Sequence, residues 1–347
     1  MKILDASIIL LVFLWLVGES LIFAEEPKAR DRAEMSVEDI VFYSQPGLSG
    51  KEPLKRKGLL FRNNRPGTRA TVLMAHGYSC NKEDIRFMSM IFSEYHVVVF
   101  DFRAHGELSA GQCCTFGSDE AYDIKAAVEF IRADPQLKKL PIVSWAFSMG
   151  AVASIEAQAR FGKLFDCAVW DCPFDSTEEL IARAIEHLKI TVLGHSFRIP
   201  GRSFLLKYAY HPWVQGGLKM ALRTIANIDA SLVPTRLVPI DVVASAQKIT
   251  IPVFFVTCQK DTKAPPAAVR NICDAVPGFT RFWITEGEYH FRSFFQNPEK
   301  YRRKVLHFIE NFLDGTLSQK VQKKVWIDEG LVRKSGEKGA VPVKSIK

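Results

Sequence analysis

The chain contains 347 residues, of which 48% are hydrophobic, and its formal net charge at pH 7 is +8. This length and apolar content suffice for a complete hydrophobic core, and the sequence shows neither an internal repeat nor a low-complexity stretch, which excludes a repeat architecture. The charge does not favour nucleic-acid binding, because about half of it lies in residues 314–347, where Trp326 is the only aromatic side chain. We expect this basic C-terminal tail to be a solvated, partly ordered extension.

Residues 1–24 contain an apolar run from Ala6 to Gly18 that follows Lys2. A run of about a dozen residues fits the core of a signal peptide better than a membrane-spanning helix, which needs roughly twenty. We therefore expect export to the periplasm or the extracellular space, with cleavage after Ala24. A retained N-terminal anchor is the alternative, and it would attach the protein to a membrane.

Strand-like and helix-like segments alternate between residues 36 and 313, which we expect to form one α/β domain. Strands are expected at 41–43, 58–61, 70–74, 96–100, 141–145, 165–170, 251–258 and 281–285, and helices at 82–94, 119–133, 149–161, 265–276 and 298–313. Because most connections would be helical, the central strands should run parallel in a doubly wound sheet.

The first candidate site element follows the strand at 70–74, which runs into His76, Gly77 and Tyr78. Glycine lets the chain turn sharply and present backbone N–H groups to a developing negative charge. We expect the N–H of Tyr78 to be one donor of an oxyanion hole. The alternative is a simple turn that contains a hydrogen-bonded histidine.

A candidate nucleophile, Ser148, stands where a predicted strand meets a predicted helix. Its neighbours Ala146 and Gly150 are small, as a tight strand-turn-helix connection that exposes one strained serine requires. The pattern is a relaxed form of Gly-x-Ser-x-Gly, with alanine at the first glycine position. Taken alone, such a pattern more often marks a serine that only caps the following helix. If Ser148 is the nucleophile, the N–H of Met149 is the second expected oxyanion donor.

The alternation of strands and helices breaks between Pro173 and Ser245, where the chain is rich in Leu, Ile, Tyr and Trp. This segment is too long and too apolar for a plain loop. We expect residues 175–235 to form a small helical lid over the active-site edge of the sheet. Its aromatic side chains would either line a pocket for an acyl or alcohol group or pack the lid onto the core.

Two later loops supply a candidate acid and a candidate base. Asp261 follows the buried strand at 251–258, and the carboxyl ends of parallel strands are where a doubly wound sheet places functional groups. His290 follows the strand at 281–285 and could reach over the sheet edge to both Ser148 and Asp261. Taken alone, Asp261 would be an ordinary loop aspartate and His290 an ordinary surface histidine. The order of the Tyr78 loop, the serine, the aspartate and the histidine along the chain favours a functional interpretation instead.

Because the elements occur in the order oxyanion loop, nucleophile, acid and base, the chain over residues 55–313 resembles the α/β-hydrolase superfamily. Within it, the chain resembles the serine-hydrolase branch of small bacterial esterases and prolyl-oligopeptidase-like enzymes. The segment 100–109 looks like the loop after the fourth strand of that fold, and we interpret it as structural. Asp171, at the end of the sixth strand, is the alternative acid, because some members supply it there and the residues before Asp261 depart from the common His-Gly-x-x-Asp.

The resemblance implies two-step acyl transfer, in which Ser148 attacks a carbonyl and His290 takes its proton. The expected substrate is a small-molecule ester or a short acyl compound. A prolyl-oligopeptidase-like peptidase or amidase and a catalytically silent binding module are the alternatives. Dehalogenase and epoxide-hydrolase chemistry is disfavoured, because that branch carries aspartate at the nucleophile position. The sequence leaves the acyl chain length and the oligomeric state open.

No cofactor and no metal are expected. The seven cysteines are an odd number and cannot all pair, and a bridge between the adjacent Cys113 and Cys114 would be strained. No two cysteines have metal-ligand spacing, and a His-Glu-x-x-His motif is absent. Residues 47–52 lack the spacing and the hydroxyl group of a phosphate-binding loop.

Overall fold

The computed structural model describes residues 35–186, 189–192, 195–198, 208, 233–317 and 323–327. The predicted signal peptide or anchor at 1–24 lies outside these residues, as do most of the predicted lid and most of the C-terminal tail. Within the described ranges, none of the helices combines the length and the apolar character that a membrane crossing requires.

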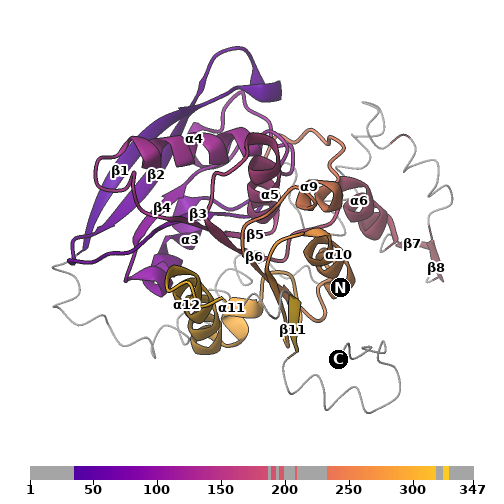
Figure 1. Ribbon diagram of the computed structural model, residues 1–347. Helices are drawn as coiled ribbons and strands as arrows, with labels where there is room; N and C mark the ends of the chain where they lie inside the picture. The colour runs from indigo at the N-terminus through magenta and orange to yellow at the C-terminus, as the bar shows by residue number, and fades with distance from the viewer. Residues whose placement is uncertain are drawn as a thin grey trace, which may run out of the picture.

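One sheet forms the centre of the molecule (Figure 1), and in the described part of the chain it has nine strands in the order β1-β2-β4-β3-β5-β6-β9-β10-β11. The strands are β1 (Met35–Ser44), β2 (Leu54–Asn63), β3 (Thr71–Ala75), β4 (His96–Phe100), β5 (Ile142–Phe147), β6 (Cys167–Asp171), β9 (Val253–Cys258), β10 (Thr280–Thr285) and β11 (Lys323–Ile327). The pairs β1–β2 and β2–β4 are antiparallel, and all other pairs in this sheet are parallel. The predicted mostly parallel, doubly wound sheet is therefore confirmed.

Helices cover both faces of the sheet (Figure 1), so the central strands are buried on both sides. Every residue of β3, β4, β5, β6 and β9 is buried, which explains why these strands read as continuous apolar runs. The edge strand β1 instead alternates, with Ile40 and Phe42 buried and Val41 and Tyr43 exposed. Alternation of this kind marks a strand with one solvated face.

Two hydrophobic clusters pack against the sheet. The first cluster includes Ile124, Val152 and Ile272 from three helices, and the second includes Met88 and Val305. The helices and turns are η1 (Gly47–Ser49), α3 (Lys82–Ile85), η2 (Arg86–Phe92), η3 (Gly106–Leu108), α4 (Glu120–Ala133), α5 (Met149–Phe161), α6 (Thr177–Glu186), α9 (Val242–Ala246), α10 (Pro266–Ala275), α11 (Ser293–Gln296) and α12 (Pro298–Leu313). The predicted helices at 149–161 and 298–313 have the observed bounds.

The predicted helix at 82–94 differs from the structure. A capping box formed by Asn81 and Asp84 starts α3, but the chain tightens into the 3-10 helix η2 after Ile85. Met88 and Ile91 of η2 are buried, and side chains three residues apart lie on the same face of a 3-10 helix. The segment thus buries its apolar side chains without forming a long α-helix.

Two further elements were not predicted. The described part of the insertion contains α6 and an antiparallel hairpin of β7 (Lys189–Val192) and β8 (His195–Arg198), so it is not purely helical. The hairpin begins with a run of β-branched residues, which favour strands. The C-terminal tail, which we expected to be a solvated, partly ordered extension, contributes the strand β11, which pairs in parallel with β10 at the edge of the sheet.

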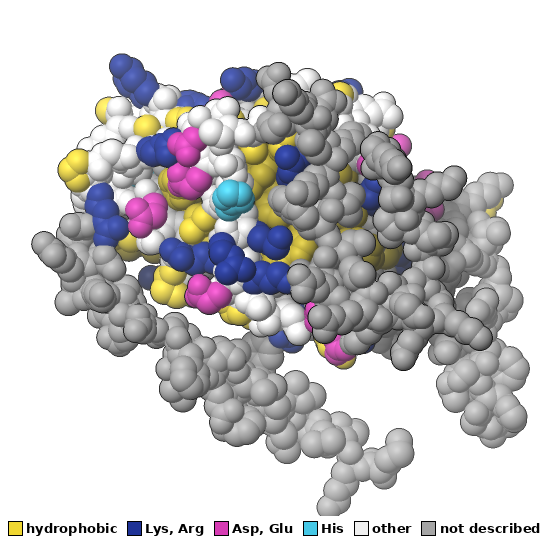
Figure 2. Space-filling view, turned by 60° about the horizontal axis from the view of Figure 1, so that its bottom comes forward, with side chains coloured by type: hydrophobic (Ala, Val, Ile, Leu, Met, Phe, Trp, Pro, Cys, Tyr) yellow, Lys and Arg dark blue, Asp and Glu magenta, His cyan; other side chains and the backbone are white. Residues whose placement is uncertain are grey.

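The positive charge is not confined to the C-terminal tail. Figure 2 brings the bottom of Figure 1 forward and shows Lys and Arg side chains gathered among hydrophobic ones on this face of the molecule. The helix α12, which lies on this side in Figure 1, has four basic residues within its first seven positions, namely Lys300, Arg302, Arg303 and Lys304.

Candidate active site

Ser148 occupies a strained turn between β5 and α5. Its backbone has φ 52° and ψ −126°, a left-handed conformation that residues other than glycine rarely adopt. The turn is held by its backbone, because the Ser148 N–H donates to Asp171 O at 2.9 Å and the Ser148 carbonyl accepts from Val152 N at 3.1 Å. A Cβ at Gly150 would lie 2.4 Å from His76 O, so the residue at this position must be glycine. The small residues of the sequence pattern therefore have a steric cause.

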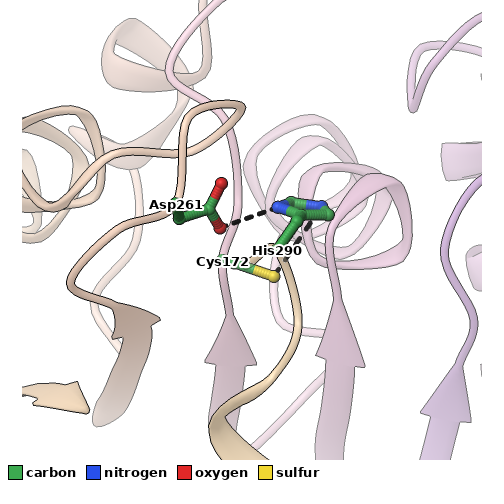
Figure 3. A group of neighbouring side chains, drawn as sticks. All are labelled: Cys172, Asp261 and His290. Carbon is green, nitrogen blue, oxygen red and sulfur yellow. Dashed lines mark hydrogen bonds and ion pairs between the residues drawn. The ribbon is translucent and has the colours of Figure 1, made fainter. Parts of the chain in front are cut away.

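The structure brings Ser148, His290 and Asp261 together. His290 Nε2 lies 2.7 Å from Ser148 Oγ, and His290 Nδ1 lies 2.7 Å from Asp261 Oδ2. Figure 3 shows Asp261 pointing at the edge of the imidazole ring from the loop after its strand. These contacts join three loops at the carboxyl ends of β5, β9 and β10, as parallel strands allow. The arrangement can pass a proton from the serine hydroxyl to the imidazole while a carboxylate holds the ring.

The carboxylate of Asp261 is buried and fully hydrogen-bonded. Its Oδ1 accepts from the backbone N–H groups of Lys263 and Ala264, both at 2.9 Å, while Oδ2 faces His290. Burial acts to raise the pKa of this carboxyl, but the imidazole and the two N–H donors outweigh burial and lower it below the ordinary aspartate value. Asp261 is therefore ionised at neutral pH and holds His290 with Nδ1 protonated.

The loop that carries His290 is fixed by an aromatic stack. Phe291, the next residue, has a positive φ of 56°, and its ring stacks on Phe147 with centroids 3.7 Å apart and planes 12° apart. Phe147 is the residue before Ser148, so the stack ties the nucleophile strand to the histidine loop. Aromatic contacts of this kind add stability beyond their buried area.

Tyr78 and Met149 line the same cavity as Ser148 and His290. Met149 is the first residue of α5, so its N–H has no acceptor within the helix and forms part of the positive end of the helix dipole. Phe116 stacks on the ring of Tyr78 with centroids 4.8 Å apart, which gives the cavity an aromatic wall. The two predicted oxyanion residues thus flank the serine.

Two buried histidines shape the loop that contains Tyr78. His76 Nε2 accepts from Phe102 N at 3.1 Å, and His105 Nε2 accepts from Ser79 N at 3.1 Å. Burial lowers the pKa of His76 to about 3 and that of His105 to about 4, so both rings are neutral acceptors at pH 7. The segment 100–109 therefore packs against the loop that carries Tyr78 and is hydrogen-bonded to it.

Asp171, the alternative acid, lies behind the site and not against the imidazole. It is fully buried at the end of β6, and its Oδ1 accepts from Ser293 Oγ at 3.4 Å. Burial raises the pKa of this carboxyl to about 7, and the nearby Asp261 adds to the effect, although the Tyr301 hydroxyl acts in the opposite direction. Among the described residues, the carboxylate hydrogen-bonded to His290 is that of Asp261.

Cys172 also lies beside the ring (Figure 3), and no sequence motif had singled it out. Its Sγ is 3.9 Å from His290 Nε2, and Cys172, Asp261 and His290 offer ligand atoms within 4.8 Å of one another. Burial raises the pKa of the thiol well above its usual value, which disfavours the thiolate that a metal would bind. Asp261 and His290 are also already bonded to each other. The chemistry of these groups fits proton transfer better than metal binding.

Lys263 is a second residue that the sequence did not single out as functional. Its backbone N–H supports Asp261, and its side chain lines the cavity with Ser148 and His290. Its position two residues after the candidate acid could have suggested proximity to the site. The sequence offered no sign that the side chain turns into the cavity.

The geometry agrees with comparisons to known proteins. A family model described as "Alpha/beta hydrolase family" matches residues 72–304 of this chain. The chain belongs to this family, and the family supports hydrolase activity. The uncharacterized protein YqkD of Bacillus subtilis is 25% identical over 250 residues, which cover 71% of this chain and 73% of that protein.

Two solved structures illustrate the shared fold. The Pyrococcus furiosus esterase Pf2001 is 21% identical, with a TM-score of 0.58 over 83% of this chain and 97% of that one. The peroxisomal α/β-hydrolase Lpx1 of Saccharomyces cerevisiae is 12% identical, with a TM-score of 0.57 over 82% of this chain and 91% of that one. At these identities the similarity concerns the fold, and the reaction must be argued from the site.

Proposed function

We propose that this protein is a serine hydrolase that cleaves a carboxylic ester through an acyl-enzyme intermediate on Ser148. The observation that carries the proposal is the continuous chain of contacts from Ser148 Oγ through His290 to Asp261, with both hydrogen bonds at 2.7 Å. An unactivated serine hydroxyl is a weak nucleophile, and an adjacent base oriented by a third group is the usual means of activating it.

In the proposed reaction, Ser148 Oγ attacks the ester carbonyl carbon while His290 Nε2 takes the hydroxyl proton. The N–H groups of Tyr78 and Met149 stabilise the oxyanion of the tetrahedral intermediate. His290 then protonates the departing alkoxide, which leaves as an alcohol. Water attacks the acyl carbon in the second step, His290 takes the proton of the water, and collapse of the intermediate returns that proton to Ser148 and releases a carboxylic acid.

The test compares the wild type with Ser148→Ala on 4-nitrophenyl esters of graded acyl chain length. Ser148→Ala should lower kcat by about 10⁴-fold or more, since it removes the nucleophile. Ser93→Ala is the matched control. This serine lies between η2 and β4, at the opposite end of the sheet from the site, and its replacement should leave kcat unchanged. Equal turnover by Ser148→Ala and wild type would contradict the proposal.

Matched 4-nitroanilides separate an esterase from an amidase. An anilide requires the same groups but has a poorer leaving group, so turnover of esters without turnover of anilides identifies an esterase. Comparable cleavage of both would indicate a peptidase or amidase instead. A folded protein that cleaves neither substrate at any chain length would favour the catalytically silent binding module.

A further inference from the structure

The described lining of the cavity beside Ser148 includes Lys263 among aromatic and aliphatic side chains. Its described lining consists of Tyr78, Ser79, Phe116, Ser148, Met149, Phe174, Leu180, Lys263 and His290. None of these residues is acidic, so Lys263 supplies a positive charge that no carboxylate in the lining balances. A mostly apolar site with a few fixed polar groups is the form that small-molecule specificity usually takes.

Among the described residues, no hydrogen-bond or ion-pair partner contacts the ammonium group of Lys263. Lys260 on the same loop instead pairs with Glu288 at 2.6 Å. Burial lowers the pKa of Lys263, although the charge of Asp261 acts against this effect. Asp261 already accepts from two backbone N–H groups and from His290.

A partly buried ammonium group without a partner carries a desolvation cost that a bound anion would offset. The anion would have to belong to the substrate, because the cation shares the cavity with the nucleophile. A carboxylate on the acyl or alcohol part of the ester would gain a charge-assisted hydrogen bond, and the apolar walls would contact the carbon chain.

We propose that Lys263 is a specificity-determining residue that selects esters carrying a carboxylate, such as monoesters of dicarboxylic acids. This inference rests on the proposed ester hydrolysis and extends it to a substrate class. Lys263 takes no part in the bond-making steps, so its role is to bind one end of the substrate while Ser148 attacks the other.

The experiment compares substrate pairs that differ in one terminal charge. The anionic members are the 4-nitrophenyl monoesters of glutaric, adipic and suberic acid, and the neutral members are 4-nitrophenyl esters of unbranched monocarboxylic acids with the same number of carbons. The wild type should prefer at least one anionic ester by about tenfold or more in kcat/KM, the value of one charge-assisted hydrogen bond.

Lys263→Met should abolish this preference and leave the neutral ester within about threefold of wild type, because methionine keeps the backbone N–H donor to Asp261 and removes only the charge. Lys260→Met is the matched control on the same loop and should retain the preference. The proposal is overturned if the wild type shows no preference in any pair, or if the preference survives in Lys263→Met. It is also overturned if Lys263→Met slows both esters equally, which would mark Lys263 as a support for Asp261 alone.

Calorimetry on Ser148→Ala separates failure of this inference from failure of the proposed reaction. Monomethyl adipate is an anion at pH 7 and dimethyl adipate is neutral, and neither is turned over without the nucleophile. Ser148→Ala should bind the monomethyl ester more tightly than the dimethyl ester, and the added Lys263→Met should remove the difference. Equal binding would overturn the role of Lys263 even if the wild type proves inactive on every ester.

Discussion

The carboxyl ends of the neighbouring strands β6 and β9 carry two buried aspartates with opposite electrostatic character. Asp171 ends β6, and burial raises its pKa to about 7, whereas the pKa of Asp261, three residues after β9, is lowered. Both side chains are removed from solvent. Burial therefore does not decide the protonation state, and the difference lies in the partners.

Asp261 has partners that favour its charged form, namely two backbone N–H groups and the imidazole of His290. For Asp171, burial and the negative charge of Asp261 outweigh the Tyr301 hydroxyl and the long hydrogen bond from Ser293 at 3.4 Å. A carboxylate can stay ionised in an apolar interior only where donors replace the lost water. Asp261 is therefore the carboxyl that stays fully ionised at neutral pH and can orient a base, whereas a pKa of about 7 leaves Asp171 partly protonated.

The largest effect is expected for Asp261→Asn. The asparagine oxygen would accept the two backbone N–H groups, so its NH₂ would donate to His290 Nδ1 and force the proton onto Nε2. His290 could then no longer accept the proton of Ser148, and kcat should fall roughly 10³- to 10⁴-fold. The measurement is ester turnover at pH 7.5. Near-normal turnover would show that Asp261 does not orient the base.

Asp171→Asn should leave kcat within about threefold, because the hydrogen bond from Ser148 N goes to the backbone of Asp171 and not to its side chain. Its effect should appear in stability instead. The raised pKa means that the folded state favours the protonated carboxyl. The contribution of this group to the free energy of unfolding is therefore complete below about pH 4 and is lost as pH rises through about 7.

The free energy of unfolding of the wild type should therefore fall by roughly 2–4 kcal/mol from this group between pH 4 and pH 8, and asparagine removes that loss. Urea unfolding of both proteins at pH 5 and pH 8 measures the difference. If the free energy of unfolding depends on pH in the same way in both proteins, the raised pKa does not belong to Asp171. If Asp171→Asn loses as much kcat as Asp261→Asn, the roles assigned to the two aspartates are wrong.

The smallest effect is expected for Cys172→Ala, beside the same ring. Burial keeps the thiol protonated, and its Sγ lies 3.9 Å from His290 Nε2, whereas Ser148 Oγ lies at 2.7 Å. The thiol is therefore not a competing nucleophile, and kcat should stay within about threefold of wild type. A loss of ester turnover comparable to that of Ser148→Ala would show that the sulfur takes part in the reaction.

Chain order and local pattern were enough to predict the sheet, the helices at 149–161 and 298–313 and the turn around Ser148. These features depend on periodicity and on steric demands that single residues reveal, such as the glycine at 150. The edge strand β11 was not predictable, because its pairing with β10 depends on which sheet edge is free. Likewise, the stack of Phe291 on Phe147 joins residues 144 positions apart, so no local sequence pattern predicts it.

The choice between Asp171 and Asp261 as the acid also depends on three-dimensional contacts that the sequence does not reveal. Asp171 ends one buried strand and Asp261 follows another, and both lie between the nucleophile and the base in the chain, so the order of the elements fits either carboxyl. Which carboxyl faces the imidazole depends on loop geometry. The turn at Lys263 and Ala264 directs two N–H groups at Asp261, and it becomes visible only in three dimensions.

The most direct test of the central claim is covalent labelling with a fluorophosphonate, which reacts with a serine that is activated by a neighbouring base. Intact-mass spectrometry and peptide mapping should find one adduct per chain, located on Ser148, with labelling absent in Ser148→Ala and strongly slowed in Asp261→Asn. Folded wild-type protein that remains unlabelled, or that carries its adduct on another residue, would contradict the account.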